Sequence, residues 1–422
     1  MNSPRSAPSP WSRSLAWIPT LYFAQGLPYV LVMTVSVVMY KRLGVSNAAI
    51  AFVTSWLYLP WVLKPLWSPL VDLRRTRRWW TLVMQAVGAG AMVAIAAALH
   101  AASWYVALSL AVFAVMAIAS ATHDIACDGF YMFALLQREQ AAYVGVRSTF
   151  YRLAMIAGQG ALVVLAGRWE VAWGNVRSAW SATFALAAGV FATLAIYHTL
   201  MLPRPATDVD HRGSDSGSLG RRWRQELESW SEVFSSFFRR PGIGRVLAFL
   251  LLYRFAEAQL VKLVSPFLLD GREVGGLGLT TAQVGVAYGT VGVAALLAGG
   301  ILGGLAGARW GLGKILWPCV IMLHLPDVVF LALSIVQPQS LSVVSLALAL
   351  EQFGYGFGFS AYVLFLLMIA DGPHKTAHYA IATGVMALGM MIPGMFSGAI
   401  RGVGYRASCG SWRRFFLSRS DS

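Results

Sequence analysis

The chain has 422 residues, of which 57% are hydrophobic and only 12% are charged, and its formal net charge is +15. With a mean hydropathy of +0.62, this composition excludes an ordinary soluble domain and indicates a protein that crosses the lipid bilayer many times. The positive charge does not indicate nucleic-acid binding, because Lys and Arg lie at the edges of apolar segments and form no single basic face.

Apolar segments long enough to cross the hydrocarbon as helices, about 20 residues, recur along the chain. We predict an all-α polytopic membrane protein with an N-terminal six-helix bundle (1–202), a cytoplasmic loop (203–241) and a C-terminal bundle of five spans (242–422). The eleven predicted spans are 15–40, 47–71, 79–100, 104–126, 144–167, 179–202, 243–268, 282–308, 315–336, 341–370 and 379–400.

The orientation is predicted from Lys and Arg, which concentrate in cytoplasmic connections. Residues 74–78, after the second span, include four Arg, and the loop 203–241 includes seven. The connections around Ala101 and Gln337 carry no Lys or Arg. We therefore expect a cytoplasmic N-terminus. The basic residues that weaken this asymmetry are Lys41, Arg42, Arg168 and Arg177.

The central loop contains aromatic and aliphatic residues at helical spacing, with charged residues between them. This pattern predicts an amphipathic helix on the cytoplasmic membrane surface, and an ordinary connector with incidental periodicity is the alternative. The apolar positions are Trp223, Leu227, Trp230, Phe234, Phe237 and Phe238.

Two carboxylates, Asp124 and Asp128, lie at the predicted end of the fourth span. Charged groups at membrane depth usually face a partner charge or a polar path. Arg147 is at the edge of the fifth span and Arg152 about two turns inside it, so we predict ion pairs between these helices, and assign Asp72 to the same region. Such pairs would act as a gate that changes during transport, or as permanent structural pairs.

The seventh span carries Arg254, Glu257 and Lys262, which fall within about 140° of one helix face. A face this polar is expected to line a central cavity, since contact with lipid would be costly. Two cations with one acid favour an anionic or zwitterionic substrate. The alternative is that Arg254 and Glu257, three residues apart, neutralise each other.

The tenth span contains Glu351 near its middle, followed by Gln352. A carboxyl group buried away from water takes up a proton readily, so Glu351 or Glu257 is a candidate for proton coupling. A hydrogen-bonded structural role is the alternative for Glu351. His324 and Asp327 form a further polar pair in the ninth span, with no assigned role.

Polar side chains that can bind sugar or amide groups also occur in the spans. On the first span, Gln25 and Tyr29 are candidates for the substrate cavity, together with Gln352 on the tenth. A packing role is the alternative for Tyr29. No metal site and no cofactor are expected.

The two halves share a weak internal pattern. The connection after the second span reads SPLVDLRRTRRWW, and that after the eighth reads GGILGGLAGARWGLGKIL. Basic residues therefore follow the second span of each half, as in a transporter built from two repeats. In this respect the chain resembles the major facilitator superfamily, although 69–78 keeps mainly the acid and the basic cluster of its loop pattern. The resemblance implies two six-helix bundles.

A narrower resemblance extends over nearly the whole chain, from about residue 22 to 404, and is to the AmpG-type muropeptide permeases. Its motifs are FAQGLP (23–28), LKPLWSPLVD (63–72), HDIACD (123–128), FYRLAMIAGQGALV (150–163) and EQFGYGFGFSAYVLFLLM (351–368). It implies proton-driven import of anhydro-muropeptides for cell-wall recycling through the bacterial cytoplasmic membrane, and it favours Glu351 for coupling because the family pattern has an acid there.

Other functions are open at this point. Related permeases carry siderophores or acetyl-CoA, so a siderophore or another amphiphilic anion is an alternative substrate. His123 and Asp128 also match a short acyltransferase pattern, so a polytopic acyl or glycosyl transferase is the alternative from another class. We expect a transporter that acts as a monomer.

The chain ends in RASCGSWRRFFLSRSDS, where a permease of this type would have a twelfth span. This tail is too short and too basic to cross the bilayer. With eleven spans its four Arg would lie in the periplasm, against the positive-inside rule. A truncated or frame-shifted C-terminus is therefore expected.

Overall fold

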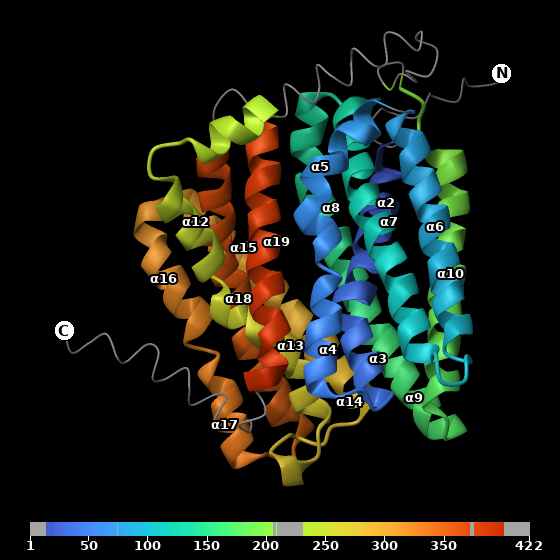
Figure 1. Ribbon diagram of the computed structural model, residues 1–422. Coiled ribbons are helices and arrows are strands. Elements are labelled where there is room, and N and C mark those ends of the chain that lie inside the picture. The colour runs from blue at the N-terminus through green and yellow to red at the C-terminus, as the bar shows by residue number, and fades with distance from the viewer. Residues whose placement is uncertain (1–13, 74, 206–207, 209–230, 372–374, 401–422) are drawn as a thin grey trace, which may run out of the picture.

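The structure, a computed structural model, describes residues 14–73, 75–205, 208, 231–371 and 375–400, except for a few side chains near helix ends. Within these residues the regular elements are helices, which stand side by side in two groups (Figure 1). The first group is the N-terminal half and the second the C-terminal half. This arrangement confirms the predicted all-α fold.

The N-terminal half contains the first six spans, of which the first, second and fifth are each made of consecutive helical pieces. Its helices are α2 Ile18–Val30, η1 Leu31–Val35, α3 Ser36–Arg42, α4 Asn47–Trp56, α5 Leu59–Leu73, α6 Arg77–Ala98, α7 Tyr105–Ala134, α8 Gln137–Met155, η2 Ile156–Leu162, α9 Val163–Trp173 and α10 Val176–Met201.

The C-terminal half contains the other predicted spans, and its seventh and ninth spans are interrupted. Its helices are α12 Ile243–Leu252, α13 Phe255–Leu269, η4 Arg272–Val274, α14 Thr281–Val284, η5 Gly285–Gly292, α15 Val293–Trp310, α16 Leu312–His324, α17 Val328–Val336, α18 Leu341–Ala370 and α19 Lys375–Ile400.

The helices match the predicted spans closely. Ten helical segments of the described chain are long and apolar enough to cross a membrane. The remaining predicted span corresponds to α12 and α13, which carry Arg254, Glu257 and Lys262. The C-terminal tail, on which the expected truncation rests, lies outside the described residues.

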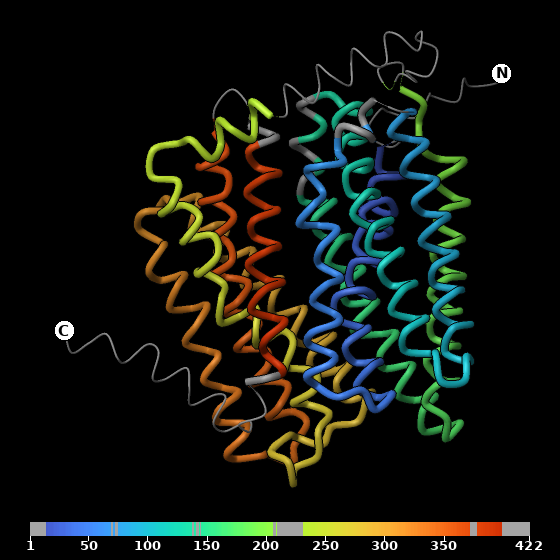
Figure 2. The backbone as a smooth tube through the Cα atoms, viewed as in Figure 1, coloured from blue at the N-terminus to red at the C-terminus, as the bar shows by residue number. Residues whose placement is uncertain are grey.

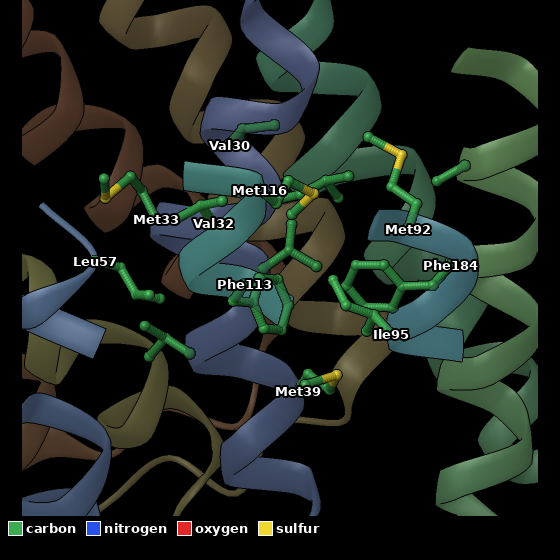
Figure 3. Close-up of a cluster of buried hydrophobic side chains, with 14 of the residues drawn as sticks. Val30, Val32, Met33, Met39, Leu57, Met92, Ile95, Phe113, Met116 and Phe184 are labelled. Atoms are coloured by element: carbon green, nitrogen blue, oxygen red, sulfur yellow. The ribbon is translucent and has the colours of Figure 1, made fainter. Parts of the chain in front are cut away.

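The N-terminal half is held together by an apolar core of large side chains from several helices (Figure 3). Phe113 of α7 and Phe184 of α10 meet edge to face with ring centroids 5.6 Å apart, and both are buried. Met92 and Ile95 of α6 lie beside them. Because lipid is as apolar as these side chains, close packing supplies most of the attraction between the helices.

The predicted ends of the fourth and fifth spans are wrong. Helix α7 continues to Ala134 and α8 begins at Gln137, so Asp128 lies inside a helix and Arg147 is well inside the next one. The Glu139 carboxylate accepts a hydrogen bond from the Leu136 backbone N–H at 3.0 Å, which supports the start of α8. Hydropathy detects where a helix leaves the apolar layer, whereas the helix itself continues through polar residues.

Several spans depart from regular α-helix. Wider π-helical turns form η1, η2 and η5, and such turns often occur at functional sites. The seventh span breaks at Tyr253 and Arg254, between α12 and α13. The ninth breaks between α16 and α17. The prediction of a continuous seventh helix is therefore wrong.

The predicted amphipathic helix is described only over 231–238, which is helical; residues 209–230 lie outside the described part. Val233 and Phe237 are buried in a cluster with residues of α12, α16, α18 and α19. The described part thus packs against the C-terminal half.

The two halves contact each other mainly at one end. We call the end with Ser14 and 231–238 the loop end, and the end where α3 meets α4 the distal end. The helices converge at the distal end and diverge at the loop end (Figures 1 and 2). The contacts between halves join α3 and α4 to α13, α4 and α5 to α19, η2 to η5, and α9 to α14 and η5; a smaller contact joins α8 to α15.

Candidate functional site

An ion pair joins the two halves at the distal end. Lys41, in the last turn of α3, pairs with Asp270, which follows α13. Asn47 at the start of α4 completes the contact, because it accepts from Lys41 Nζ at 2.8 Å and donates to Asp270 Oδ2 at 2.9 Å. Each of these three side chains therefore has a polar contact with both of the others.

A second polar cluster at the distal end centres on Glu170, which is 8% exposed. Its Oε2 accepts from Arg42 Nε at 2.9 Å and from Thr281 Oγ1 at 2.6 Å, and its Oε1 accepts from Trp180 Nε1 at 2.7 Å. Thr281 begins α14 of the C-terminal half, whereas the other three residues belong to the N-terminal half. We call Lys41, Arg42, Asn47, Glu170, Asp270 and Thr281 the distal latch.

Sequence reasoning missed the distal latch, although a signal was present. Lys41 and Arg42 lie at the opposite end of the first span from the Arg-rich loops, and a basic residue that is partly buried, as Lys41 is, needs an acidic partner. Asp270 and Glu170 follow spans that end on the same side. Their pairing with Lys41 and Arg42 depends on helices far apart in the sequence.

Glycines let the two halves approach closely beside the latch. A Cβ on Gly289 of η5 would lie 1.9 Å from the Gln159 carbonyl oxygen of η2. A Cβ on Gly167 of α9 would lie 2.3 Å from the Ala282 backbone nitrogen of α14. The backbones of the fifth and eighth spans are thus in direct contact, and only glycine fits at these positions.

Toward the loop end, Asp128 and Arg147 form one of the predicted pairs. Arg147 Nη2 donates to Asp128 Oδ1 at 2.9 Å, and the Tyr22 hydroxyl lies 3.5 Å from the same oxygen. The guanidinium also covers the rings of Tyr22 and Tyr131, 4.5 and 5.0 Å from their centroids. All four residues belong to the N-terminal half, so this pair does not bridge the halves in this conformation.

Asp124 does not pair with Arg147 or Arg152, contrary to the prediction. Its Oδ2 accepts from Trp61 Nε1 at 3.0 Å and lies 3.6 Å from Lys64 Nζ, both on α5. The physical reason is position, since Asp124 lies one turn before Asp128 and faces the second span. The Asp72 side chain lies outside the described part.

Arg152 instead points toward the other half. A Cβ added to Gly300 of α15 would lie 3.4 Å from Arg152 Nη2. Among the described residues Arg152 has no ion pair, so a cationic group of the fifth span faces the C-terminal half.

The cations of the seventh span have separate partners. Lys262, 1% exposed, donates to Thr54 Oγ1 of α4 at 2.9 Å and lies 5.1 Å from the Tyr58 ring centroid. Arg254 donates to the Tyr355 hydroxyl and covers the Tyr355 and Phe359 rings at 5.2 and 4.9 Å. Lys262 therefore bridges the halves, and Arg254 stacks on α18.

Arg254 and Glu257 do not form a direct ion pair, because their charged atoms are more than 4.0 Å apart. Glu257 instead lies with Asp327 and Glu351. One carboxylate oxygen from each of these three acids lies within 4.8 Å of the others. We call Glu257, Asp327 and Glu351 the carboxylate triad; the sequence left Asp327 without a role.

The remaining predicted residues are Gln25 and Gln352, which are buried, and Tyr29, which is partly buried. Gln25 is 7% exposed, and its Oε1 has no hydrogen-bond partner within the described chain. Tyr29 packs edge to face on Trp61 with ring centroids 5.3 Å apart. Gln352 Nε2 donates to both oxygens of Glu351, at 3.2 and 3.0 Å, so its amide serves the triad.

Comparison with known proteins identifies the family. A sequence profile described as the Major Facilitator Superfamily matches residues 20–406. An anhydromuropeptide permease of Escherichia coli (strain K12) is 26% identical over 415 residues, covering 94% of this chain and 75% of the relative. Putative transporter AmpG 4 of Rickettsia felis (strain ATCC VR-1525 / URRWXCal2) is 24% identical over 381 residues, covering 87% of this chain and 85% of the relative.

Solved structures share the fold. A bacterial homologue of the human lysosomal transporter Spinster, in an inward-facing and unoccupied conformation, has a TM-score of 0.67 and 18% identity, covering 98% of this chain and 87% of that one. The xylose transporter XylE from E. coli has a TM-score of 0.61 and 14% identity, covering 97% and 98%. These relatives are transporters and not enzymes, so the transferase alternative is discarded. The chain belongs to the major facilitator superfamily, as a multi-pass membrane permease of the AmpG type.

Proposed function

We propose that the protein is a secondary active transporter that imports anhydro-muropeptides through the bacterial inner membrane, driven by protons and acting as a monomer. The observation that carries the mechanism is the location of the ion pair between the halves. Within the described chain, the ion pair that joins the halves, Lys41 with Asp270, lies at the distal end. Opening one end while the other is closed is how such a fold moves a solute.

The orientation proposed from the charged loops puts the N-terminus in the cytoplasm. The distal end then faces the periplasm, and this conformation is closed to the periplasm by the distal latch. The Asp128–Arg147 pair would act at the cytoplasmic end, where Arg147 exchanges contacts when the halves approach each other. The location of both residues on adjacent helices of one half supports this assignment.

Anionic groups of the substrate are proposed to bind between the halves. Lys262 and Arg254 supply positive charge from the seventh span, and Arg152 supplies it from the fifth. Gln25, whose Oε1 lacks a partner, and Tyr29 offer hydrogen-bonding groups for sugar or amide atoms. Positive groups on both halves let a negatively charged peptide hold the halves together.

Proton coupling is assigned to Glu351 and Glu257. Both are almost completely buried, at 2% and 1% exposed, and they lie in the same cluster. Neighbouring buried carboxylates share protons because their negative charges repel each other. Binding and release of a proton there would change the attraction between α13 and α18.

Uptake of labelled anhydro-muropeptide into proteoliposomes tests this function. We expect accumulation with an inward proton gradient, collapse of accumulation with a protonophore, and at least a tenfold loss in Lys262→Ala. The exposed Glu273 provides a matched control, and Glu273→Gln should transport normally. Uptake of a siderophore with none of the muropeptide would contradict the proposed substrate.

A further inference from the structure

The carboxylate triad is built where two interrupted spans meet α18. Glu257 lies in the first turn of α13, just after the break in the seventh span. Asp327 is the residue immediately before α17, at the break in the ninth span. Glu351 comes from the interior of α18, a continuous helix. Interrupted spans of transporters commonly form ion and substrate sites, because their free helix ends can face a ligand.

The triad has unsatisfied oxygens in a buried place. Glu257 is 1% exposed, and its Oε2 has no hydrogen-bond partner within the described chain. Asp327 Oδ1 is also without a partner there. Buried polar atoms are normally paired, so unpaired oxygens on two neighbouring buried carboxylates are typical of a site that binds a ligand.

The charge of the triad is not balanced by protein cations in contact with it. Within the described chain no Lys or Arg nitrogen lies within 4.0 Å of its oxygens, and Arg254 is turned to Tyr355. The imidazole of His324 lies within that distance, with its Nδ1 3.8 Å from Asp327 Oδ2. Its Nε2 donates to the Tyr253 carbonyl at 3.2 Å, which ties the triad to the break in the seventh span.

The helix ends favour the ionised forms of two of the acids. Glu257 and Asp327 lie at the N-termini of α13 and α17, where the aligned peptide dipoles place partial positive charge. Ionised carboxylates this close together repel strongly in a low-dielectric interior. A bound cation relieves that repulsion and also satisfies the free oxygens.

We propose that Glu257, Asp327 and Glu351 form a binding site for one hard cation of the size of sodium or calcium. Because the three oxygens are within 4.8 Å of each other, a central point lies no more than about 2.8 Å (4.8 Å divided by √3) from each. Calcium binds oxygen ligands at about 2.3–2.6 Å, which this upper limit admits. Magnesium gives up its water ligands reluctantly and usually keeps several of them, so a buried site of three carboxylates favours the larger ion.

The donor set also restricts the class of ion. Carboxylate oxygens select hard cations, whereas copper and zinc prefer imidazole nitrogen and thiolate sulfur. The amide of Gln352 holds Glu351 in place through both of its oxygens. Sodium and calcium share the required size, so they are distinguished by experiment.

This inference deepens the proton-coupling part of the proposed function, since Glu257 and Glu351 serve both, but it is tested without transport. Cation binding to purified protein with no muropeptide uptake would refute the transport proposal alone. Proton-driven uptake with no cation binding would refute the cation site alone.

The test measures binding of radioactive ²²Na⁺ and ⁴⁵Ca²⁺ to the purified full chain in nanodiscs, without substrate. We expect saturable binding of one of these ions, with one ion per chain, and weak competition by Mg²⁺. Glu257→Gln and Asp327→Asn should each weaken binding at least tenfold, while the exposed Glu273→Gln binds as the native protein does.

The results identify the bound ion, or they show that the triad binds neither ion. Competition of Na⁺ with ⁴⁵Ca²⁺ identifies a shared site, and binding of only one of them assigns the ion. Absence of saturable binding of both, or native affinity in Glu257→Gln and Asp327→Asn, overturns the proposal. If Glu257→Gln does not fold, the test depends on Asp327→Asn. The Asp327 side chain is 15% exposed, so an amide is easier to accommodate there.

Discussion

Glu170 shows at the residue scale how one buried carboxylate can connect four spans. Arg42, Trp180 and Thr281 all donate to it, from the first, sixth and eighth spans. A buried charge is tolerated when hydrogen bonds and an opposite charge replace its hydration. Because Thr281 belongs to the other half, Glu170 links the core of one half to the contact between halves.

We expect Glu170→Gln to destabilise the protein by about 1.5–3 kcal/mol, the range for hydrogen bonds to charged groups. Arg42 would lose its ionic partner, but its side chain is 35% exposed, so the loss stays below that of a fully buried pair. Thermal unfolding in detergent measures the change, with Glu273→Gln as the control. Identical melting of Glu170→Gln and the native protein would contradict the role given to Glu170.

Neutralising Asp128 tests the pair near the loop end. Asp128→Asn leaves Arg147 on the rings of Tyr22 and Tyr131 but removes its carboxylate. Because the pair is partly exposed, we expect little change in stability and a clear change in the balance of conformations. Cysteine accessibility at both ends, with uptake, measures that balance. If accessibility and uptake both stay at native values, Asp128 is not part of a gate.

The residue pairs show what the sequence can and cannot predict. Asp128 and Arg147 lie on adjacent helices joined by a short turn, so their pairing followed from helix order. Arg42 and Glu170, or Lys41 and Asp270, come from spans far apart in the chain, and only the packed fold brings them together. The same holds for Asp327 and Glu351, whose proximity has no local signal.

At the scale of elements, hydropathy predicted every span that the structure describes, because the apolar layer sets a minimum helix length. It failed where a helix extends beyond that layer, as α7 does to Ala134. It also failed where a span breaks at Tyr253 and Arg254. Tertiary contacts, such as the His324 bond to the Tyr253 carbonyl, stabilise that break and are invisible in a local pattern.

The contact between η2 and η5 gives a prediction at the same scale. A side chain on Gly289 would collide with the Gln159 carbonyl, so Gly289→Leu should force the fifth and eighth spans apart. We expect a cysteine introduced at the distal end to become accessible to thiol reagents, and uptake to fall at least tenfold. Gly304 has no atom within 4 Å of an added Cβ, so Gly304→Leu is the matched control. Equal behaviour of the two variants would show that the distal contact does not require glycine.

At the scale of the molecule, transport requires that the halves separate at the distal end. Lys41→Cys with Asp270→Cys places two thiols across the halves, in a background with the native cysteines replaced. A short reducible thiol cross-linker should then abolish uptake, and a reductant should restore it, because the latch would be held closed. Each single cysteine variant is the control. Full uptake by the cross-linked protein would mean that the distal end does not open.

Spin-label distances at both ends, with and without anhydro-muropeptide, test the central claim most directly. Val171 with Val274 reports on the distal end, and Leu136 with Trp310 reports on the loop end; all four side chains are exposed. We expect the muropeptide under an inward proton gradient to lengthen distal distances and shorten loop-end distances in the same molecules. Unchanged distances at both ends, or both ends moving in the same direction, would contradict alternating access by this protein.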